Sequence, residues 1–248
     1  MNWLRTVRAE IRKLTSTRMP LTFLAVLVVI GAATAIAVAF GADMDGSKTF
    51  ISTAADQQSL MAFAGNALVI AGLFGAIAIA REYGHGTVVL TFLTTPRRTH
   101  AVLAQFTAAF VAGGVLGLSG AVVSAGSVAI GLSTTDYGFM VSAAGLLQVL
   151  LASTLAGGAG AVLGAGIGAL IRNTGGAVTG TIVLLIILPP LAMQMVSGMA
   201  PWVPGTLANV VSGVDTTTGT GAAIAAMSIW AFAPAAVGLV AVTRRDVM

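Results

Sequence analysis

The sequence predicts an all-α polytopic membrane protein with six transmembrane helices in one transmembrane domain, residues 1–248. Two observations lead to this prediction. First, 57% of the residues are hydrophobic and only 8% are charged, whereas a soluble domain carries about 25% charged residues. Second, the charges are confined to short pieces between long apolar stretches. The chain therefore lacks the polar surface that a water-soluble fold of this size requires.

A helix needs about 20 apolar residues to cross the hydrocarbon layer of a bilayer. This length, applied to the uncharged stretches, predicts transmembrane helices at residues 21–40, 58–80, 101–131, 141–171, 177–196 and 221–242. The first is longer than the apolar core of a secretory signal, which is about 7–15 residues, so we expect it to stay uncleaved.

Prolines mark the region around the fifth predicted helix. Pro189-Pro190, and then Pro201-Trp202-Val203-Pro204-Gly205, cannot continue a regular helix, because proline lacks an N–H and clashes with the preceding turn. We therefore expect a re-entrant or irregular outer segment between the fifth and sixth helices.

The distribution of charge predicts the orientation. If the N-terminus is cytoplasmic, all of the 12 basic residues except Lys48 lie on the cytoplasmic side, whereas the outer loops collect aspartates. A single orientation therefore satisfies the positive-inside rule. We predict a multi-pass protein of the bacterial plasma (inner) membrane with both termini in the cytoplasm.

Composition also excludes several classes of function. The basic residues sit between apolar runs instead of covering a folded surface, so nucleic-acid binding is not expected. The chain has no cysteine and only two histidines, His85 and His100, with no carboxylate cluster nearby, so we predict no metal site and no catalytic residues. Gly46 is followed by Ser47, so the P-loop motif is absent and the chain cannot hydrolyse ATP by itself.

Glycines recur at helical spacing in the third and fourth predicted helices. Gly113 and Gly117 share one face of the third, and Gly160, Gly164 and Gly168 share one face of the fourth. Such spacing lets two helix backbones approach closely in a membrane. Packing within the chain and packing against another subunit both fit this pattern.

Few polar side chains fall inside the predicted helices. The amides of Asn66, Gln148 and Gln194 are costly in hydrocarbon and should face protein or a water-filled cavity. They serve either interhelical hydrogen bonds or a transport path. No predicted helix contains a charged residue, which argues against a proton-coupled or ion-coupled pump.

The N-terminal segment, residues 1–19, predicts an amphipathic helix at the inner membrane surface. Its apolar residues recur at helical spacing, and its cations fall largely on other faces. Such a helix binds anionic lipid, and contact with a cytoplasmic partner is compatible with that role.

The loop between the second and third predicted helices has an unusual composition. Two glycines can break the incoming helix, and Thr87 can cap a short new one that ends before Pro96. Its apolar residues, which include Leu90, Phe92 and Leu93, are too many for a solvated surface. Either the membrane surface or a partner protein should cover them.

The order of these features resembles the ABC-2 type transporter permease family. The features are a basic amphipathic N-terminal segment, Arg81-Glu82 at the end of the second helix, Gly86-Thr87 four residues after the glutamate, a Leu-rich stretch and Thr95-Pro96-Arg97-Arg98. The outer Pro201-Trp202-Val203-Pro204 is similar to that family's Pro-Trp/Leu-Pro element. Gln105 departs from the family pattern, because many members carry a lysine at the start of the third helix.

The resemblance implies the membrane subunit of an ATP-binding-cassette exporter. It implies pairing with a second permease subunit, either a second copy or a homologue, above two cytoplasmic ATPase subunits that bind ATP and Mg²⁺. Residues 82–94 would form a coupling helix seated on the ATPase. Its contact positions would be Glu82, Gly86, Thr87, Leu90, Phe92 and Leu93.

A substrate path between the second and fifth helices would suit amphiphilic drugs, peptides or lipid-like molecules. The residues expected to line it are Asn66, Phe63, Met193 and Gln194. Two other functions stay open at this point. One is a non-transporting scaffold or immunity subunit of the same fold. The other is an intramembrane lipid-modifying enzyme, which would need polar catalytic residues at membrane depth.

Overall fold

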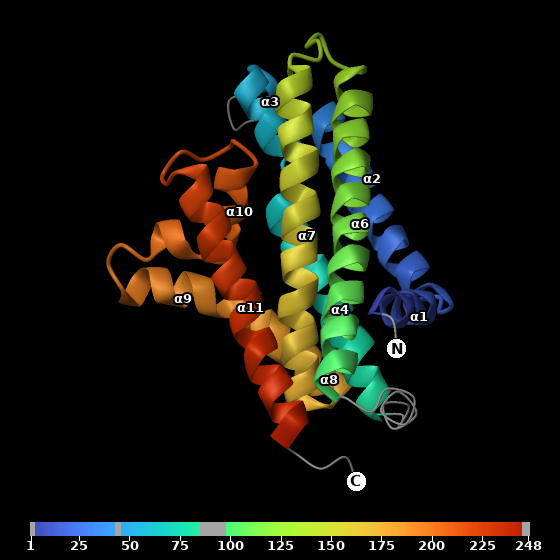
Figure 1. Cartoon of the computed structure of the whole chain (residues 1–248). Helices are drawn as coiled ribbons and strands as arrows, with labels where there is room; N and C mark the ends of the chain where they lie inside the picture. Colours follow the sequence, from blue (N-terminus) through green and yellow to red (C-terminus); the bar gives the residue numbers. More distant parts are fainter. Residues whose placement is uncertain (1–2, 43–45, 85–97, 245–248) are drawn as a thin grey trace.

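A computed structural model describes residues 3–42, 46–84 and 98–244 of the chain (Figure 1). The described part is helical and has no strand. Its elements are α1 (Trp3–Thr15), α2 (Met19–Phe40), η1 (Thr49–Ile51), α3 (Ala54–Met61), α4 (Ala64–Gly84), α6 (Arg98–Leu132), α7 (Ala143–Ile171), α8 (Thr174–Ile182), η2 (Val183–Ile187), α9 (Leu188–Met195), η3 (Ala200–Trp202), α10 (Pro204–Val211) and α11 (Thr220–Arg244).

Six helical segments are long and apolar enough to cross a membrane, which confirms the predicted number. They are Met19–Phe40, Ala54–Gly84, Arg98–Leu132, Ala143–Ile171, Thr174–Met195 and Thr220–Arg244. The predicted N-terminal helix is present as α1, which packs at the side of the bundle against the lower part of α6 (Figure 1).

The helix α7 forms the centre of the bundle, with α4, α6 and α11 packed around it (Figure 1). Its composition explains this position, because most of its buried residues are glycine and alanine. Small side chains let neighbouring backbones come close, and that proximity supplies the dispersion contacts that hold helices together in lipid.

The two ends of the bundle carry side chains of opposite charge. Arg81, Arg98, Arg172 and Arg244 lie at or next to the ends of α4, α6, α7 and α11 that share one end of the bundle, the lower end in Figure 1, and we call this the basic end. Asp56, Asp136 and Asp215 lie in or beside α3, the α6–α7 loop and α10, at the opposite end. Lys48, the exception in the sequence, donates to the carbonyl oxygen of Ala39 at 2.6 Å, near the C-terminus of α2. Carbonyls at a helix C-terminus lack intrahelical donors and attract a cation, so this lysine is satisfied locally.

The second predicted helix begins earlier than residue 58 and is interrupted. Thr53 and Asp56 form a capping box that starts α3 at Ala54. The helix then breaks at Ala62, which has an extended backbone with ψ of 95°. Phe63 follows and is buried, and its ring lies where a side chain at Gly120 of α6 would clash. The break thus places an aromatic ring between two helices.

The fifth predicted helix, residues 177–196, runs through its prolines and ends at Met195, close to the predicted bounds. The helix continues from α8 into α9 through a π-helical turn, in which the Leu188 N–H donates to the carbonyl of Val183. Pro189 and Pro190 have no N–H to donate, and a wider turn is one of the few ways to accommodate them within a helix. Figure 1 shows α9 leaving the bundle, as expected for a helix with prolines at a π-turn.

The segment between the fifth and sixth helices is more regular than predicted. Pro204 occupies the first turn of α10, where the absence of an N–H costs nothing. Gln58 and Gln148 donate to the carbonyl oxygens of Ser212 and Val211 at 3.0 and 3.3 Å. Since these carbonyls end α10, the two amides attach that short helix to α3 and α7. For Gln148, this contact is the interhelical hydrogen bond that the sequence left open.

Candidate functional site

The helix α1 packs on the bundle partly through polar residues. Thr6 and Glu10 are buried, and the ring of Trp3 lies 4.9 Å from that of His100 at the start of α6. Of the apolar residues of α1, Leu4 is 68% exposed, whereas Val7, Ile11 and Leu14 are half-buried. Leu14 also packs against a buried hydrophobic cluster of the bundle, so the packed surface of α1 combines buried polar residues with part of its apolar stripe.

Lys13 joins α1 to the end of α4. Its Nζ lies 2.7 Å from a carboxylate oxygen of Glu10 and 2.8 Å from Oε1 of Glu82. The other oxygen of Glu82 accepts a hydrogen bond from Nε2 of Gln105 on α6 at 2.7 Å. We call these four residues the α1–α4–α6 junction. Because Glu82 is bonded from two other helices at once, the junction holds the three helix ends together.

Burial and neighbouring charges shift the pKa values of Glu10 and Lys13, the two junction residues on α1. The pKa of Glu10 is raised, first by burial and also by the charge of Glu82, while the bond to Lys13 opposes the rise. Burial lowers the pKa of Lys13, but attraction to Glu82 and Glu10 outweighs it, so the net change is upward from 10.5. A raised lysine pKa means that the stabilising charge is present at neutral pH and is lost only above pH 10.5.

Gln105, the departure from the family pattern, is only 2% exposed. Its amide gives Glu82 a neutral donor, whereas the cation beside Glu82 comes from Lys13. Sequence reasoning missed Glu10, Lys13 and Gln105 as partners of Glu82. The spacing of Trp3, Thr6, Glu10 and Lys13, which places one residue of each helical turn on the same face, is the signal that could have revealed the packed surface.

A second contact joins α4, α7 and α11 at the basic end. Arg172 follows α7 in a left-handed conformation, with φ of 59°, and its guanidinium lies 5.2 Å from the centre of the Tyr83 ring. Its Nη2 also donates to the carbonyl oxygen of Ala241 at 3.4 Å. An arginine over an aromatic face gains a cation–π attraction, which here links the last turns of two helices.

The predicted coupling positions are only partly described. The helix α4 runs through Gly84, so Glu82 belongs to its last turn, and a separate coupling helix cannot begin at residue 82 as predicted. Gly86, Thr87, Leu90, Phe92 and Leu93 lie outside the described residues. Gly84 and Arg98, which flank this segment, both lie at the basic end, next to the α1–α4–α6 junction.

The predicted glycine faces lie at the closest helix contacts within the chain. Side chains added at Gly113 and Gly117 of α6 would meet backbone atoms of Gly157 and Ser153 in α7. Those added at Gly160, Gly164 and Gly168 of α7 would meet the backbone of α4 at Leu68, Gly72 and Ala76. Two faces of α7 thus contact two helices through glycine.

The predicted path residues occupy different environments. Phe63 is buried beside Gly120, whereas Asn66 and Gln194 are exposed and Met193 is 44% exposed. Within the described ranges, no hydrogen bond and no buried cluster links Phe63 or Asn66 to Met193 or Gln194.

No group of three or more His, Cys, Asp or Glu residues that could hold a metal ion occurs among residues 3–42, 46–84 and 98–244. Comparison of the sequence with models of protein families gives no match, and comparison with curated proteins gives none either. The family resemblance therefore rests on the motifs of the sequence.

Replacing Lys13 with methionine is expected to loosen α1. The change removes the cation that two largely buried carboxylates share, and breaking a fully buried pair costs about 3–5 kcal/mol. Because Lys13 is 41% exposed, we expect a smaller loss of about 2 kcal/mol. Hydrogen exchange of the α1 amides, measured on the full chain in nanodiscs, should become roughly thirtyfold faster.

Arg12→Met is the matched control, because it removes the same charge from an exposed position one residue away. Its exchange rates should equal those of the unmodified chain. Equal exchange in both variants would show that Lys13 does not hold α1 in place.

Proposed function

We propose that this chain is the permease subunit of an ATP-binding-cassette exporter of the ABC-2 type. In this proposal it lies in the bacterial inner membrane with both termini in the cytoplasm, so the basic end faces the cytoplasm. The positive-inside rule supports this orientation, since the described arginines gather at that end. The exposed side chain of Leu4 on α1 would then lie in the lipid interface.

The observation that carries the proposal is the α1–α4–α6 junction. It fixes three helix ends directly beside the segment that would contact the ATPase, with bonds of 2.7 and 2.8 Å to Glu82. A force applied to residues 85–97 would therefore act on α1, α4 and α6 together. Rigid-body tilting of this kind is a common way for ATP-driven closure to alternate the access of a transporter.

The proposed assembly contains two copies of an ATPase subunit, which bind ATP and Mg²⁺, and a second permease subunit. The exposed apolar surface of α9, including Leu188, Leu191 and Met195, supports a further subunit or lipid beside the fifth helix. The transported molecule would be an amphiphilic drug, peptide or lipid-like compound. This chain would contribute no catalytic residue to ATP hydrolysis.

Purification of the full chain from its native membranes tests the proposal. We expect an ATP-hydrolysing subunit to purify with it in equal number. Reconstituted vesicles should move an amphiphilic fluorescent dye only when ATP is supplied on the side of the basic end. A chain that purifies without a nucleotide-hydrolysing partner would contradict the assignment.

A further inference from the structure

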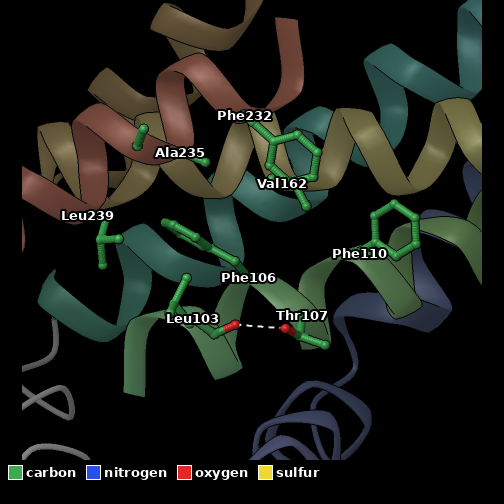
Figure 2. A pocket seen from close by; sticks show the side chains of 9 residues that line it. Leu103, Phe106, Thr107, Phe110, Val162, Phe232, Ala235 and Leu239 are labelled. Carbon is green, nitrogen blue, oxygen red and sulfur yellow. Dashed lines mark hydrogen bonds between the residues drawn. The ribbon is translucent and has the colours of Figure 1, made fainter. Parts of the chain in front are cut away.

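An apolar groove runs between α6 and α11, with α7 as its floor (Figure 2). Its volume is about 460 Å³. The side chains of Leu103, Phe106 and Phe110 form one wall, and those of Phe232 and Leu239 form the other. A smaller cavity of about 210 Å³ continues it toward the opposite end of the bundle and shares Phe110, Val162 and Phe232.

The groove offers almost nothing to a polar ligand. Its one polar lining residue, Thr107, donates its hydroxyl proton to the carbonyl oxygen of Leu103 at 2.8 Å, as Figure 2 shows. Several large apolar side chains on its walls remain exposed, among them Phe232 at 59% and Leu103 at 44%. An occupant that covers these side chains must therefore be apolar where it touches them.

The distance from the arginines to the far end of the groove is close to the thickness of one leaflet of a bilayer. Leu103 and Phe110 are seven residues apart on α6, which corresponds to about 10 Å at a rise of 1.5 Å per residue. The lining begins five residues from Arg98 on α6 and five residues from Arg244 on α11, or about 7 Å from each. Together these lengths give about 17 Å, close to the roughly 15 Å of hydrocarbon in one leaflet.

Arginines stand at the end of each helix that forms the groove. Arg98 begins α6, Arg172 follows α7 and Arg244 ends α11, where it is exposed. Arg172 contacts the carbonyl of Ala241, between the groove residue Leu239 and Arg244. Each helix that forms the groove thus carries a positive charge at or next to its end on the same side of the bundle.

We propose that this groove binds one acyl chain of an anionic glycerophospholipid, with the lipid phosphate held at the arginines of the basic end. Basic pockets at the ends of transmembrane helices bind anionic head groups in this way. A helix of the same length and about 10 Å across would need roughly 800 Å³. The cavity volume therefore favours a single hydrocarbon chain over a helix from a second copy.

Retention of lipid by the purified full chain tests this site without any ATPase, so its failure is separable from failure of the export proposal. The probes are phosphatidylglycerol and phosphatidylcholine with identical acyl chains, counted as bound molecules by native mass spectrometry after release from nanodiscs. We expect phosphatidylglycerol to be retained preferentially, by about fivefold for each arginine that contacts the phosphate.

Two sets of variants separate the tail from the head group. Ala236→Phe fills the groove and should reduce retention of both lipids, whereas Ala233→Phe, an exposed position of α11 outside the groove, should leave it unchanged. The double variant Arg98→Gln with Arg244→Gln should lower the preference for phosphatidylglycerol by about fivefold for each replaced arginine that contacts the phosphate, and should preserve retention of phosphatidylcholine.

Three results would overturn the proposal. The first is equal retention of both lipids by the unmodified chain. The second is that Ala236→Phe retains as much lipid as Ala233→Phe, including the case in which Ala236→Phe changes the oligomeric mass of the chain. The third is an unchanged preference in the double arginine variant, which would place the head group elsewhere.

Discussion

Replacing Leu90 and Phe92 together with aspartate is expected to abolish co-purification of the ATPase and ATP-driven transport. The proposed contact depends on apolar side chains in residues 85–94, a number that a solvated loop does not carry. Two carboxylates in such an interface would each lose several kcal/mol of hydration without gaining a partner. Binding weakened by this amount falls by several orders of magnitude.

The same segment supplies the control for this experiment. Thr91→Ser with Thr94→Ser changes two neighbouring positions while keeping their polarity. Co-purification and transport should persist in this variant. If the aspartate variant also kept its ATPase and its transport, the segment would have no role in coupling.

Adding one methyl group at Gly164 is expected to disrupt the bundle. The new Cβ of Gly164→Ala would overlap the carbonyl oxygen of Gly72 and lie 2.9 Å from the backbone nitrogen of Ala76. Backbone atoms cannot rotate away, so α4 and α7 must separate. Overpacking costs about 1–3 kcal/mol where side chains can adjust, and we expect at least 3 kcal/mol here.

Gly126→Ala is the matched control in a neighbouring helix. A methyl group there meets nothing within 4 Å, and alanine favours a helix over glycine by about 1 kcal/mol. The thermal unfolding midpoint in detergent should fall strongly for Gly164→Ala and stay level or rise for Gly126→Ala. A similar midpoint for both variants would contradict the observed contact between α4 and α7.

The number of helices was predictable because it follows from a property of the whole chain. Each crossing needs a long uncharged run, and Arg18, Arg81, Arg98, Arg172 and Arg244 separate or end these runs. The amphipathic pattern of the N-terminal segment likewise predicted the helix α1. Both inferences depend only on local composition and periodicity.

Details that depend on packing were not predictable in the same way. Pro189-Pro190 correctly signalled a disturbance, but the π-turn that lets the helix continue depends on the backbone of Val183–Ile187. The break before Phe63 depends on space beside Gly120, which is distant in the sequence. A sequence pattern shows that a regular helix is unfavourable at such positions and leaves open which alternative forms.

The junction shows the same limit for the candidate site. Glu82 stood out by its place in a motif, but Lys13 and Gln105 lie far from it in the chain and meet it only after folding. The apolar stripe of α1 also gave no indication that Thr6 and Glu10 would be part of its packed surface. To predict polar contacts between helices, one must know which helix faces meet in the fold.

Single-cysteine labelling of intact cells measures most directly whether residues 85–97 face the cytoplasm. The chain contains no cysteine, so Thr87→Cys and Thr216→Cys each introduce one unique thiol. A membrane-impermeant maleimide should label position 216 in intact cells and position 87 only after lysis. Labelling of position 87 from outside intact cells would contradict the proposed orientation and, with it, coupling to a cytoplasmic ATPase.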